Sequence, residues 1–309
     1  MKPKVIIIGG PTASGKSNLA LELAQEIDGE IISCDSMQVY MEMDIGTAKP
    51  TKEDMQKVKH YMIDIVKPNE SFNVVQYINM VKPIIQDVLK RNKVPILVGG
   101  TGLYVESLIN NIEFVESEND YEYRKELEEF SKQNGNEMLY DKLLSIDPEF
   151  ANSIHVNDTK RIIRGLEVYH KTGNTMTYYN KKSREKESPY TFYLFGIIED
   201  REKLYERINK RIYIMLEIGL IQEVENIYKK YNDFPTAMQG LGYKEVVSYL
   251  NNEYSYEEMV EKLAKEVEEH DAKYAEFKNL SEEELNAYSY NTELEKRTSA
   301  LIEKINKVL

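Results

Sequence analysis

Residues 4–17 read KVIIIGGPTASGKS, and this stretch decides the fold class. The apolar run at residues 5–8 is typical of a strand that is buried on both faces, as in a parallel sheet. An amphipathic pattern at residues 18–27 then predicts a helix. Between the strand and the helix, residues 10–17 match the P-loop pattern G-x-x-x-x-G-K-S/T in full. The stretch therefore predicts an α/β domain that binds a phosphorylated ligand.

The P-loop pattern combines several anion-binding groups. Glycines let successive backbone N–H groups converge on phosphate oxygens, and the helix N-terminus adds partial positive charge. Lys16 would supply a mobile cation, and Ser17 would supply a hydroxyl for Mg²⁺. We expect the whole loop to contact the ligand, namely Gly10, Pro11, Thr12, Ala13, Ser14, Gly15, Lys16 and Ser17.

Short apolar runs recur along the chain and predict four more strands, at residues 30–33, 61–66, 94–98 and 192–198. Helix-sized segments separate the first four of the five strands, as in βαβ units. The last strand follows only after roughly ninety residues, which is longer than a connection within a compact domain. We therefore predict a P-loop NTPase-like parallel sheet flanked by helices, with an insertion before the last strand.

The insertion is predicted to be helical. Its expected helices lie at residues 121–132, 137–145 and 159–171, and Gly173 would stop the last of them. Another helix is expected after the last strand, at residues 201–217. The expected domains are a P-loop α/β core with C-terminal helices, at residues 1–114 and 191–309, and a small all-helical insertion subdomain at residues 115–190.

Composition limits the class of protein. Hydrophobic residues make up 41% of the 309 residues and charged residues 30%, so the chain can bury a core, and a wholly disordered protein is excluded. No apolar stretch approaches the ~20 residues of a membrane-spanning helix, and no membrane partner is expected. The single cysteine, Cys34, excludes an internal disulfide and favours a cytoplasmic location.

P-loop NTPases usually place an aspartate at the end of an apolar strand, where it holds Mg²⁺ and positions water, and the best candidate strand here lacks it. Residues 94–98 lead into GGTG at residues 99–102 with no acid, whereas Asp35 follows the second strand. Because ligands bind outside the carboxyl ends of strands, Asp35 and Thr101 would both face the phosphate cradle. The alternative is that Asp35 caps a turn and Thr101 caps a helix.

Charge alone leaves several assignments open. The net charge of −13 argues against a protein that coats its whole surface with nucleic acid. Residues 151–190 carry eight Lys or Arg against four Asp or Glu, which makes either a basic patch or a solvated helix face. Arg207 and Arg211 share a helix face and either reach the cleft or lie over the surface. Structural roles are expected for His60 and His155, because no zinc-site spacing is present.

Taken together, these segments resemble one family, the tRNA dimethylallyltransferases, also called isopentenyl-diphosphate:tRNA transferases. The resemblance covers about the first 260 residues, and its DIGTAKP and GGT runs are not general P-loop features. The stretches that carry it are residues 10–17, 35–40, 43–50, 60–64, 98–104, 157–164 and 240–245.

The resemblance implies transfer of a dimethylallyl group from dimethylallyl diphosphate to N6 of the adenosine 3′ of the anticodon in tRNA, with Mg²⁺ as cofactor. Asp35 would be the general base, and Thr101 would help to hold the amine. Lys16 and Arg211 would bind the diphosphate, and Ser17 would contact Mg²⁺. The strip that reads the target base would be Ser36, Met37 and Gln38. The matching tRNA contacts are Arg124, Lys160, Arg161 and Arg164.

The chemistry of these residues agrees with that activity. An adenine N6 amine is a poor nucleophile, so a carboxylate that accepts its proton would help, and cations would stabilise the departing diphosphate. No attacking water is needed, which explains the missing hydrolase aspartate. The implied partners are dimethylallyl diphosphate and the tRNA anticodon stem-loop, and we expect a monomer. The alternatives are a prenyltransferase for free adenine nucleotides, a P-loop small-molecule kinase and a non-catalytic RNA-binding protein.

The chain departs from the family near its C-terminus. The family typically has a basic segment there, of the type Lys-Arg-Gln followed by Thr-Trp-Phe. Residues 266–279 read EVEEHDAKYAEFKN, which is acidic, and the chain contains no tryptophan. Phosphate neutralisation usually supplies much of nucleic-acid binding, so this acidic segment weakens the case for tight tRNA binding unless the basic stretch at residues 151–190 compensates.

Overall fold

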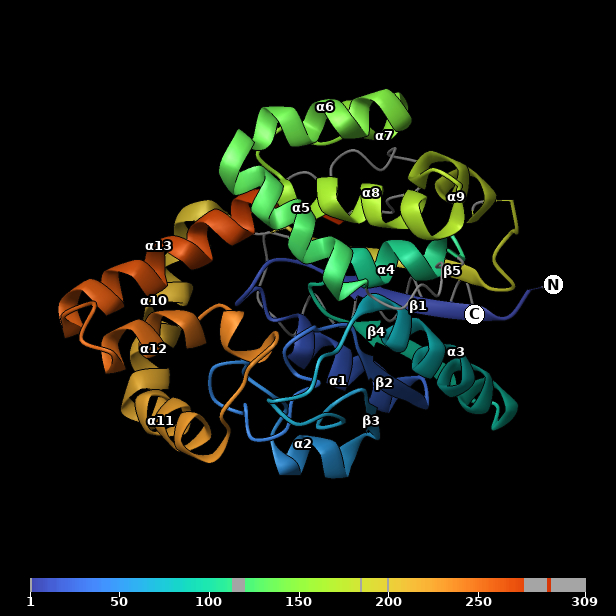
Figure 1. The fold of residues 1–309 in the computed structure, drawn as a ribbon. Helices are drawn as coiled ribbons and strands as arrows, with labels where there is room; N and C mark the ends of the chain where they lie inside the picture. The colour runs from blue at the N-terminus through green and yellow to red at the C-terminus, as the bar shows by residue number, and fades with distance from the viewer. Residues whose placement is uncertain (1, 113–119, 184, 199, 275–287, 290–309) are drawn as a thin grey trace. The chain divides into compact units, whose positions relative to one another are not determined.

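The computed structural model describes residues 2–112, 120–183, 185–198, 200–274 and 288–289. The chain divides into two compact units, one formed by residues 1–106 with 189–309 and one by residues 107–188 (Figure 1). The first unit contains the sheet, and the described part of the second unit contains helices only. No helix in the described ranges combines the length and the apolar character that a bilayer span requires.

The sheet is parallel throughout and has the strand order β3-β2-β4-β1-β5-β6. The strands are β1 (Lys4–Gly9), β2 (Gly29–Ser33), β3 (His60–Tyr61), β4 (Val94–Val98), β5 (Thr191–Ile198) and β6 (Tyr288–Ser289). The mixed α/β fold with a parallel sheet is thereby confirmed. The strand expected at residues 61–66 is wrong in length, because Met62 and Asp64 adopt positive φ angles of 63° and 53°. A strand cannot continue through such left-handed residues.

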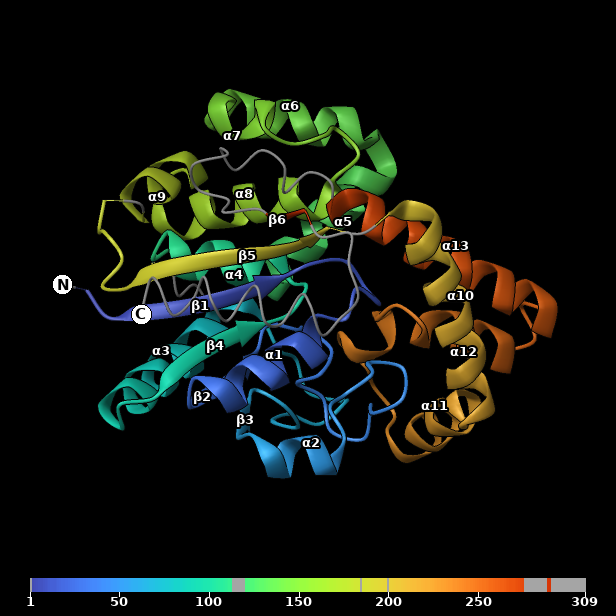
Figure 2. The same cartoon turned by 180° about the vertical axis from the view of Figure 1, so that it is seen from behind.

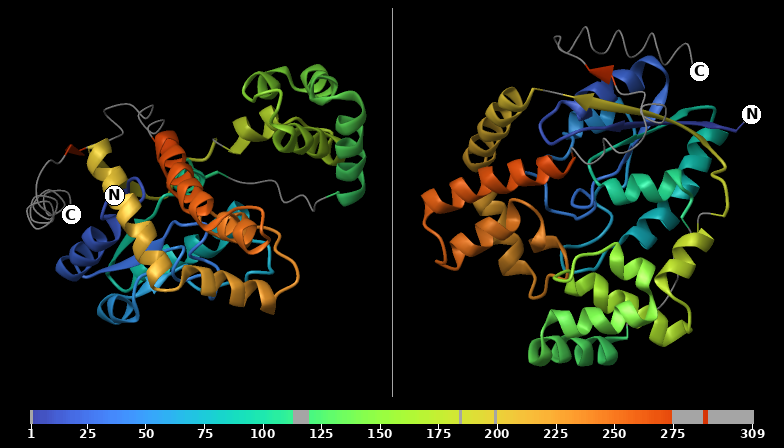
Figure 3. Two further views of the ribbon diagram at one scale, coloured as in Figure 1. Left: turned by 90° about the vertical axis from the view of Figure 1, so that its left-hand side faces the viewer. Right: turned by 90° about the horizontal axis from the view of Figure 1, so that it is seen from above.

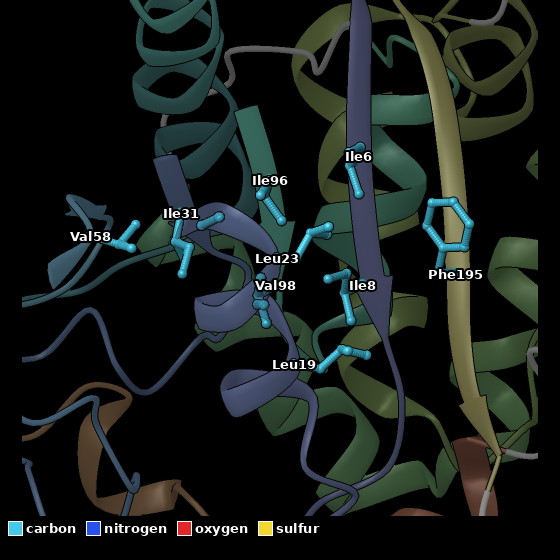
Figure 4. Packing of buried hydrophobic residues seen from close by; sticks show 11 residues of the cluster. Ile6, Ile8, Leu19, Leu23, Ile31, Val58, Ile96, Val98 and Phe195 are labelled. Atoms are coloured by element: carbon cyan, nitrogen blue, oxygen red, sulfur yellow. The ribbon is translucent and has the colours of Figure 1, made fainter. Parts of the chain in front are cut away.

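Alternating strand residues place the main core between the sheet and α1 (Lys16–Glu26). Ile6, Ile8, Ile96 and Val98 point to the same face, where they meet Leu23 of α1 (Figure 4). Because successive residues of a strand point to opposite faces, the residues between them face the other side of the sheet. There α3 (Val74–Lys90) covers the sheet with its apolar stripe, and Asn73 begins this helix with a capping box.

In the described residues after β5, four α-helices gather beyond the carboxyl ends of the strands (Figure 2). They are α10 (Arg201–Glu217), α11 (Leu220–Lys230), α12 (Tyr243–Leu250) and α13 (Tyr256–Tyr274), with the short helix η1 (Ala237–Gln239) before α12. Both views in Figure 3 show α10 and α13 close together. The Asp200 side chain begins α10 by accepting hydrogen bonds from two backbone N–H groups, and α10 carries Arg211 toward the sheet. The remaining helices of this part are α2 (Lys52–Lys57) and α4 (Gly102–Ile109).

The second unit has its own core. Its helices are α5 (Tyr121–Asn134), α6 (Asn136–Ile146), α7 (Pro148–Asn152), α8 (Thr159–Thr172) and α9 (Met176–Ser183). Leu127, Leu139, Leu143, Ile162 and Leu166 pack together in its interior. Asp120, Asp147 and Asp158 begin three of these helices with side-chain caps, and Gly173 ends α8 with a φ of 69°.

Candidate active site

The strand order brings three loops together at one edge of the sheet. Strand β4 lies between β1 and β2, and Val98 pairs with Ile8 on one side and with Ser33 on the other. The chain segments that leave these three strands are the P-loop, residues 34–38 and residues 99–101. Since the carboxyl ends of parallel strands meet at one edge, the three loops surround a common space.

The P-loop leads directly into α1. Gly15 adopts a φ of 86° immediately before the first helical residue, and Ala13 has a φ of 61°. These left-handed residues turn the chain so that Lys16 stands at the helix N-terminus, where backbone N–H groups and partial positive charge favour an anion. The Lys16 ammonium donates a hydrogen bond to the Pro11 carbonyl at 3.1 Å, which folds the side chain back over the loop.

Asp35 uses one carboxylate oxygen to hold its own turn. Its Oδ1 accepts hydrogen bonds from the Met37 N–H at 2.8 Å and from the Gln38 N–H at 3.2 Å. Within the described residues, its Oδ2 has no hydrogen-bond partner. The turn cap considered from the sequence is therefore present, and it leaves the second oxygen for other chemistry.

Thr101 is tied to the same turn. Its Oγ1 accepts a hydrogen bond from the Ser36 N–H at 3.0 Å, and its own N–H donates to the Cys34 carbonyl at 3.0 Å. A hydroxyl that accepts one bond still has a second lone pair and a proton to offer. Asp35 and Thr101 thus come from different strands but form one bonded group.

A cavity of ≈ 580 Å³ joins these groups to the P-loop. Lys16, Asp35, Thr101 and Arg211 all contribute to its wall. Its other lining residues include Thr12, Ser36, Met37, Leu241, Lys244 and Glu266. An adjoining, smaller cavity shares several of these residues and adds Ser17, Gln38 and His60. The expected site residues that line one of these two cavities are Thr12, Lys16, Ser17, Asp35, Ser36, Met37, Gln38, Thr101 and Arg211. The other expected P-loop residues, Gly10, Pro11, Ala13, Ser14 and Gly15, line neither of them.

One wall of the cavity is the segment of residues 44–49, which α11 holds in place. The Glu223 carboxylate accepts hydrogen bonds from the N–H groups of Asp44, Ile45 and Gly46, at 2.9, 2.8 and 3.2 Å. It also accepts a bond from the Tyr243 hydroxyl at 2.7 Å. Sequence reasoning missed Glu223, because it lies far from this segment in the chain and its spacing looks like that of any amphipathic helix.

The buried Lys49 side chain also stabilises the segment of residues 44–49. Its ammonium donates to the Tyr40 carbonyl and to the carboxylates of Asp44 and Asp64, at 2.7, 2.7 and 2.5 Å. Only 4% of the Lys49 side chain is exposed, so this cation belongs to the loop and not to a ligand. The Lys-Pro end of the DIGTAKP run therefore has a structural explanation.

Three glycines lie where other backbone or side chains approach closely. A Cβ at Gly99 would stand 2.5 Å from the Cys34 carbonyl group, and one at Gly46 would stand 2.5 Å from the Tyr243 ring. A Cβ at Gly240 would stand 2.6 Å from Met37 Sδ. Gly99 and Gly240 let neighbouring loops of the site approach closely, and Gly46 does the same for the first residue of α12.

His60 and Cys34 occupy sheltered positions near the site. The His60 Nδ1 is 2.8 Å from the Val58 carbonyl oxygen, and burial lowers the pKa of this imidazole. Burial raises the pKa of the Cys34 thiol to about 12, so the thiol stays neutral near neutral pH. The neutral Cys34 thiol is a weak nucleophile, and neither residue belongs to a metal-binding cluster among the described residues.

The residues at the P-loop suit a magnesium ion that is shared with a phosphorylated ligand. In the described ranges, no three His, Cys, Asp or Glu side chains cluster closely enough to hold a metal. Mg²⁺ typically keeps several waters and binds through one or two protein oxygens together with substrate phosphates. Ser17, next to Lys16 in the cavity wall, offers such an oxygen. The donor set therefore fits a ligand-borne Mg²⁺ and not a metal held by protein alone.

Comparison with known proteins identifies the family. The sequence model of the IPP transferase family matches residues 38–275. The chain belongs to the IPP transferase family. The tRNA dimethylallyltransferase of Halothermothrix orenii is 50% identical over 260 residues, which cover 84% of this chain and 79% of that protein. The resemblance inferred from the motifs is confirmed, and the chain is an enzyme of the transferase class.

Two solved structures of IPP transferases have the same fold. That of the tRNA isopentenylpyrophosphate transferase of Staphylococcus epidermidis is 40% identical, with a TM-score of 0.70, and covers 99% of this chain and 100% of its own. That of a eukaryotic dimethylallyltransferase acting on tRNA is 25% identical, with a TM-score of 0.84, and covers 99% and 80%. This chain therefore shares its fold with both of these proteins.

The basic residues expected to contact tRNA divide into two groups in the helical unit. Arg124 and Arg164 both bond to Oε2 of Glu167, at 2.8 and 3.0 Å, and Glu167 is fully buried. Lys160 is exposed, and Arg161 pairs only loosely with neighbouring Asp158, at 3.4 Å. The first two arginines thus hold the unit together and present one third of their side chains to solvent, at 33% and 34%.

In the acidic C-terminal segment, residues 266–279, only the first two residues have described side chains. The Glu266 carboxylate accepts a hydrogen bond from the Lys244 ammonium at 2.7 Å, and both residues line the large cavity. The side chains of residues 268–274, and residues 275–279 as a whole, lie outside the described part of the chain. The expected effect of this segment on tRNA binding therefore stays a prediction.

Proposed function

We propose that this IPP transferase moves a dimethylallyl group from dimethylallyl diphosphate to N6 of the adenosine 3′ of the anticodon in tRNA, with release of diphosphate. The observation that carries the proposal is that Asp35, which keeps one oxygen without a protein partner in the described residues, lines the same cavity as Lys16 of the P-loop. A base and an anion cradle that face one space suit a displacement in which an amine attacks and a diphosphate leaves.

In this reaction the N6 lone pair forms a bond to C1 of the dimethylallyl group as the bond from C1 to oxygen breaks. The electron pair of the broken bond stays with the diphosphate. Asp35 Oδ2 accepts the proton that N6 loses, and the Thr101 hydroxyl holds the amine within reach. Since Asp35 Oδ1 is occupied by two backbone N–H groups, the carboxylate has a fixed direction during this transfer.

Charge that develops on the leaving group would be stabilised by the P-loop amides, Lys16 and Arg211. Ser17 would hold Mg²⁺ together with phosphate oxygens, and the bound ion would neutralise part of that charge. The cavity volume of ≈ 580 Å³ is within the range of small-molecule sites. An adenine that leaves its stack in a single-stranded anticodon loop reaches such a site at low cost.

Binding of tRNA would use the helical unit, residues 115–190 of the expected insertion subdomain. Lys160 and Arg161 are its most accessible expected contacts, and Arg124 and Arg164 would present their remaining donors. Ser36, Met37 and Gln38 would lie beside the target base. This role places the enzyme in the cytoplasm, where tRNA is modified, and we propose that it acts as a monomer.

The test is incubation of the enzyme with dimethylallyl diphosphate, Mg²⁺ and a tRNA that has adenosine next to the anticodon. We expect prenylated adenosine, detected by mass spectrometry of the digested tRNA. If AMP competes as the better acceptor, the enzyme is an adenine-nucleotide prenyltransferase. Saturable ATP turnover without use of the prenyl diphosphate would indicate a kinase. Tight tRNA binding without either product would indicate a non-catalytic RNA-binding protein.

Two substitutions separate the assigned roles. Asp35→Ala should lower kcat by about 10²-fold or more and leave binding of dimethylallyl diphosphate nearly unchanged, because the base acts on the acceptor. Lys16→Ala should lower kcat and also weaken binding of dimethylallyl diphosphate, because the ammonium would contact the diphosphate. Single-turnover rates and equilibrium binding measure the two effects. Equal losses of diphosphate affinity in the two variants would contradict the assignment.

A further inference from the structure

We propose that Tyr77 is a positioning residue for the transfer reaction. Its side chain supports the end of β2, which leads into Asp35, and the start of α4, which follows Thr101. The inference rests on the proposed function, because that function assigns Asp35 and Thr101 to the reacting amine. Tyr77 lies on α3, outside the recognised motifs, and it lines neither of the two site cavities. Its part in the reaction would therefore be indirect.

The Tyr77 hydroxyl contacts the two residues that directly precede Asp35. It lies 3.0 Å from the Ser33 carbonyl oxygen and 2.9 Å from Cys34 Sγ. Tyr77 is fully buried, and burial raises its pKa and that of the Cys34 thiol, so both groups keep their protons. The neutral phenol therefore donates its hydrogen bond to the Ser33 carbonyl at neutral pH.

The Tyr77 ring supports the other member of the pair. It stacks on the Tyr104 ring with 3.9 Å between centroids and an angle of 16° between planes. Tyr104 belongs to the first turn of α4, and its N–H donates to the Thr101 carbonyl at 3.0 Å. One side chain thus touches the segment that carries Asp35 and the segment that carries Thr101.

The sheet fixes these two segments from a different direction. The Cys34 N–H donates to the Val98 carbonyl at 2.7 Å, and the Thr101 N–H donates to the Cys34 carbonyl. These bonds join the ends of neighbouring strands, whereas Tyr77 reaches Cys34 and Tyr104 from α3, which covers one face of the sheet. Proton transfer needs heavy atoms at hydrogen-bond distance, and a shift of about 1 Å can cost about 10²-fold in rate. A support from the helix layer therefore matters for rate more than for binding.

The experiment replaces only the hydroxyl. Tyr77→Phe keeps the ring stack, and we expect kcat to fall about tenfold while KM for dimethylallyl diphosphate stays within about twofold. The matched control is Tyr61→Phe. Its hydroxyl also makes two hydrogen bonds, to Glu30 at 2.8 Å and from Arg91 at 2.9 Å, but near the start of β2. The control should keep wild-type kcat.

A double-mutant cycle separates positioning from general packing. If Tyr77 acts through Asp35, Tyr77→Phe should have no further effect on the single-turnover rate in the Asp35→Ala background. A persistent tenfold loss in that background, or an unchanged kcat in the single variant, would overturn the inference. If Tyr77→Phe unfolds, Cys34→Ala, which removes one partner of the hydroxyl, should lower kcat with KM unchanged, and an unchanged kcat there would overturn it. A wild-type enzyme that makes no prenylated adenosine would refute the proposed function itself.

Discussion

Gly46 lies against the ring of Tyr243, and a Cβ atom at this position would come within 2.5 Å of a ring carbon. Tyr243 is fully buried and its hydroxyl is bonded to Glu223, so the ring has no room to give way. At the scale of single residues, this contact leaves room for the Cα hydrogen of glycine but not for a methyl group.

Gly46→Ala should therefore destabilise the enzyme by about 1–3 kcal/mol, the usual effect of overpacking, and lower its activity. Urea unfolding measures the first effect and prenyl transfer the second. Gly196→Ala is the control, because a Cβ there meets nothing within 4 Å. A Gly46→Ala variant as stable as this control would mean that Tyr243 moves freely.

Helix α11 shows how one element shapes the site from a distance. Its Glu223 carboxylate receives three backbone N–H groups of residues 44–46 and the Tyr243 hydroxyl. An amide side chain carries no charge and offers only one oxygen, so it cannot replace these bonds. The position of the cavity wall thus depends on an element that contributes no reacting group.

Glu223→Gln should cost about 1–3 kcal/mol and speed amide hydrogen exchange in residues 44–46, because these three N–H donors lose their charged acceptor. Hydrogen-exchange mass spectrometry can follow this segment. Glu225→Gln, on the same helix, affects only exposed side-chain bonds, those with Lys229 and Gln222, and should leave exchange unchanged. Equal exchange in both variants would rule out a supporting role for Glu223.

Sequence reasoning succeeded where a pattern is local. The strand, P-loop and helix at residues 4–26 follow from apolar periodicity, and the strand-end positions of Asp35 and Thr101 follow from the βαβ rule. It failed at residues 61–66, where left-handed Met62 and Asp64 end the strand early. The angles of such residues depend on distant contacts, such as that of Lys49 with Asp64, which no local pattern contains.

The same limit applies to Tyr77 and to the arginines of the helical unit. Tyr77 falls in the apolar stripe of a helix, where a core residue is the ordinary expectation. Arg124 and Arg164 match positions where the family contacts tRNA, which stays a prediction, but no local pattern shows that both also bond to buried Glu167. Charge patterns do not show which cations a buried acid has already engaged.

At the scale of the whole molecule, each unit contains a sheltered carboxylate that arginine keeps ionised. A hydrogen bond from Arg91 lowers the pKa of Glu30 below its ordinary 4.5 in the sheet unit. Burial alone would raise the pKa of Glu167 in the helical unit, but bonds from Arg124, the Asp120 backbone and Arg164 lower it below 4.5. A depressed pKa stabilises the fold above the unfolded value, and this stabilisation is lost as pH falls through the folded value.

Both units should therefore lose stability as pH drops below about 4.5, each through its own carboxylate. Glu167→Gln should flatten the acid-induced loss in residues 107–188 only, and Glu30→Gln should flatten it in the sheet unit only. Unit-resolved hydrogen exchange between neutral and acidic pH measures both. An identical pH profile of the helical unit in wild type and Glu167→Gln would contradict the prediction.

The position of β5 in the sheet has a consequence for synthesis on the ribosome. Strand β1 pairs with β4 on one side and with β5 on the other, but the whole of residues 107–188 is translated between those two neighbours. A nascent chain can fold the local helical unit while the β5-facing edge of β1 is still unpaired. That interval, with an uncovered strand border, is when the growing polypeptide is most exposed to mispairing and most in need of chaperones.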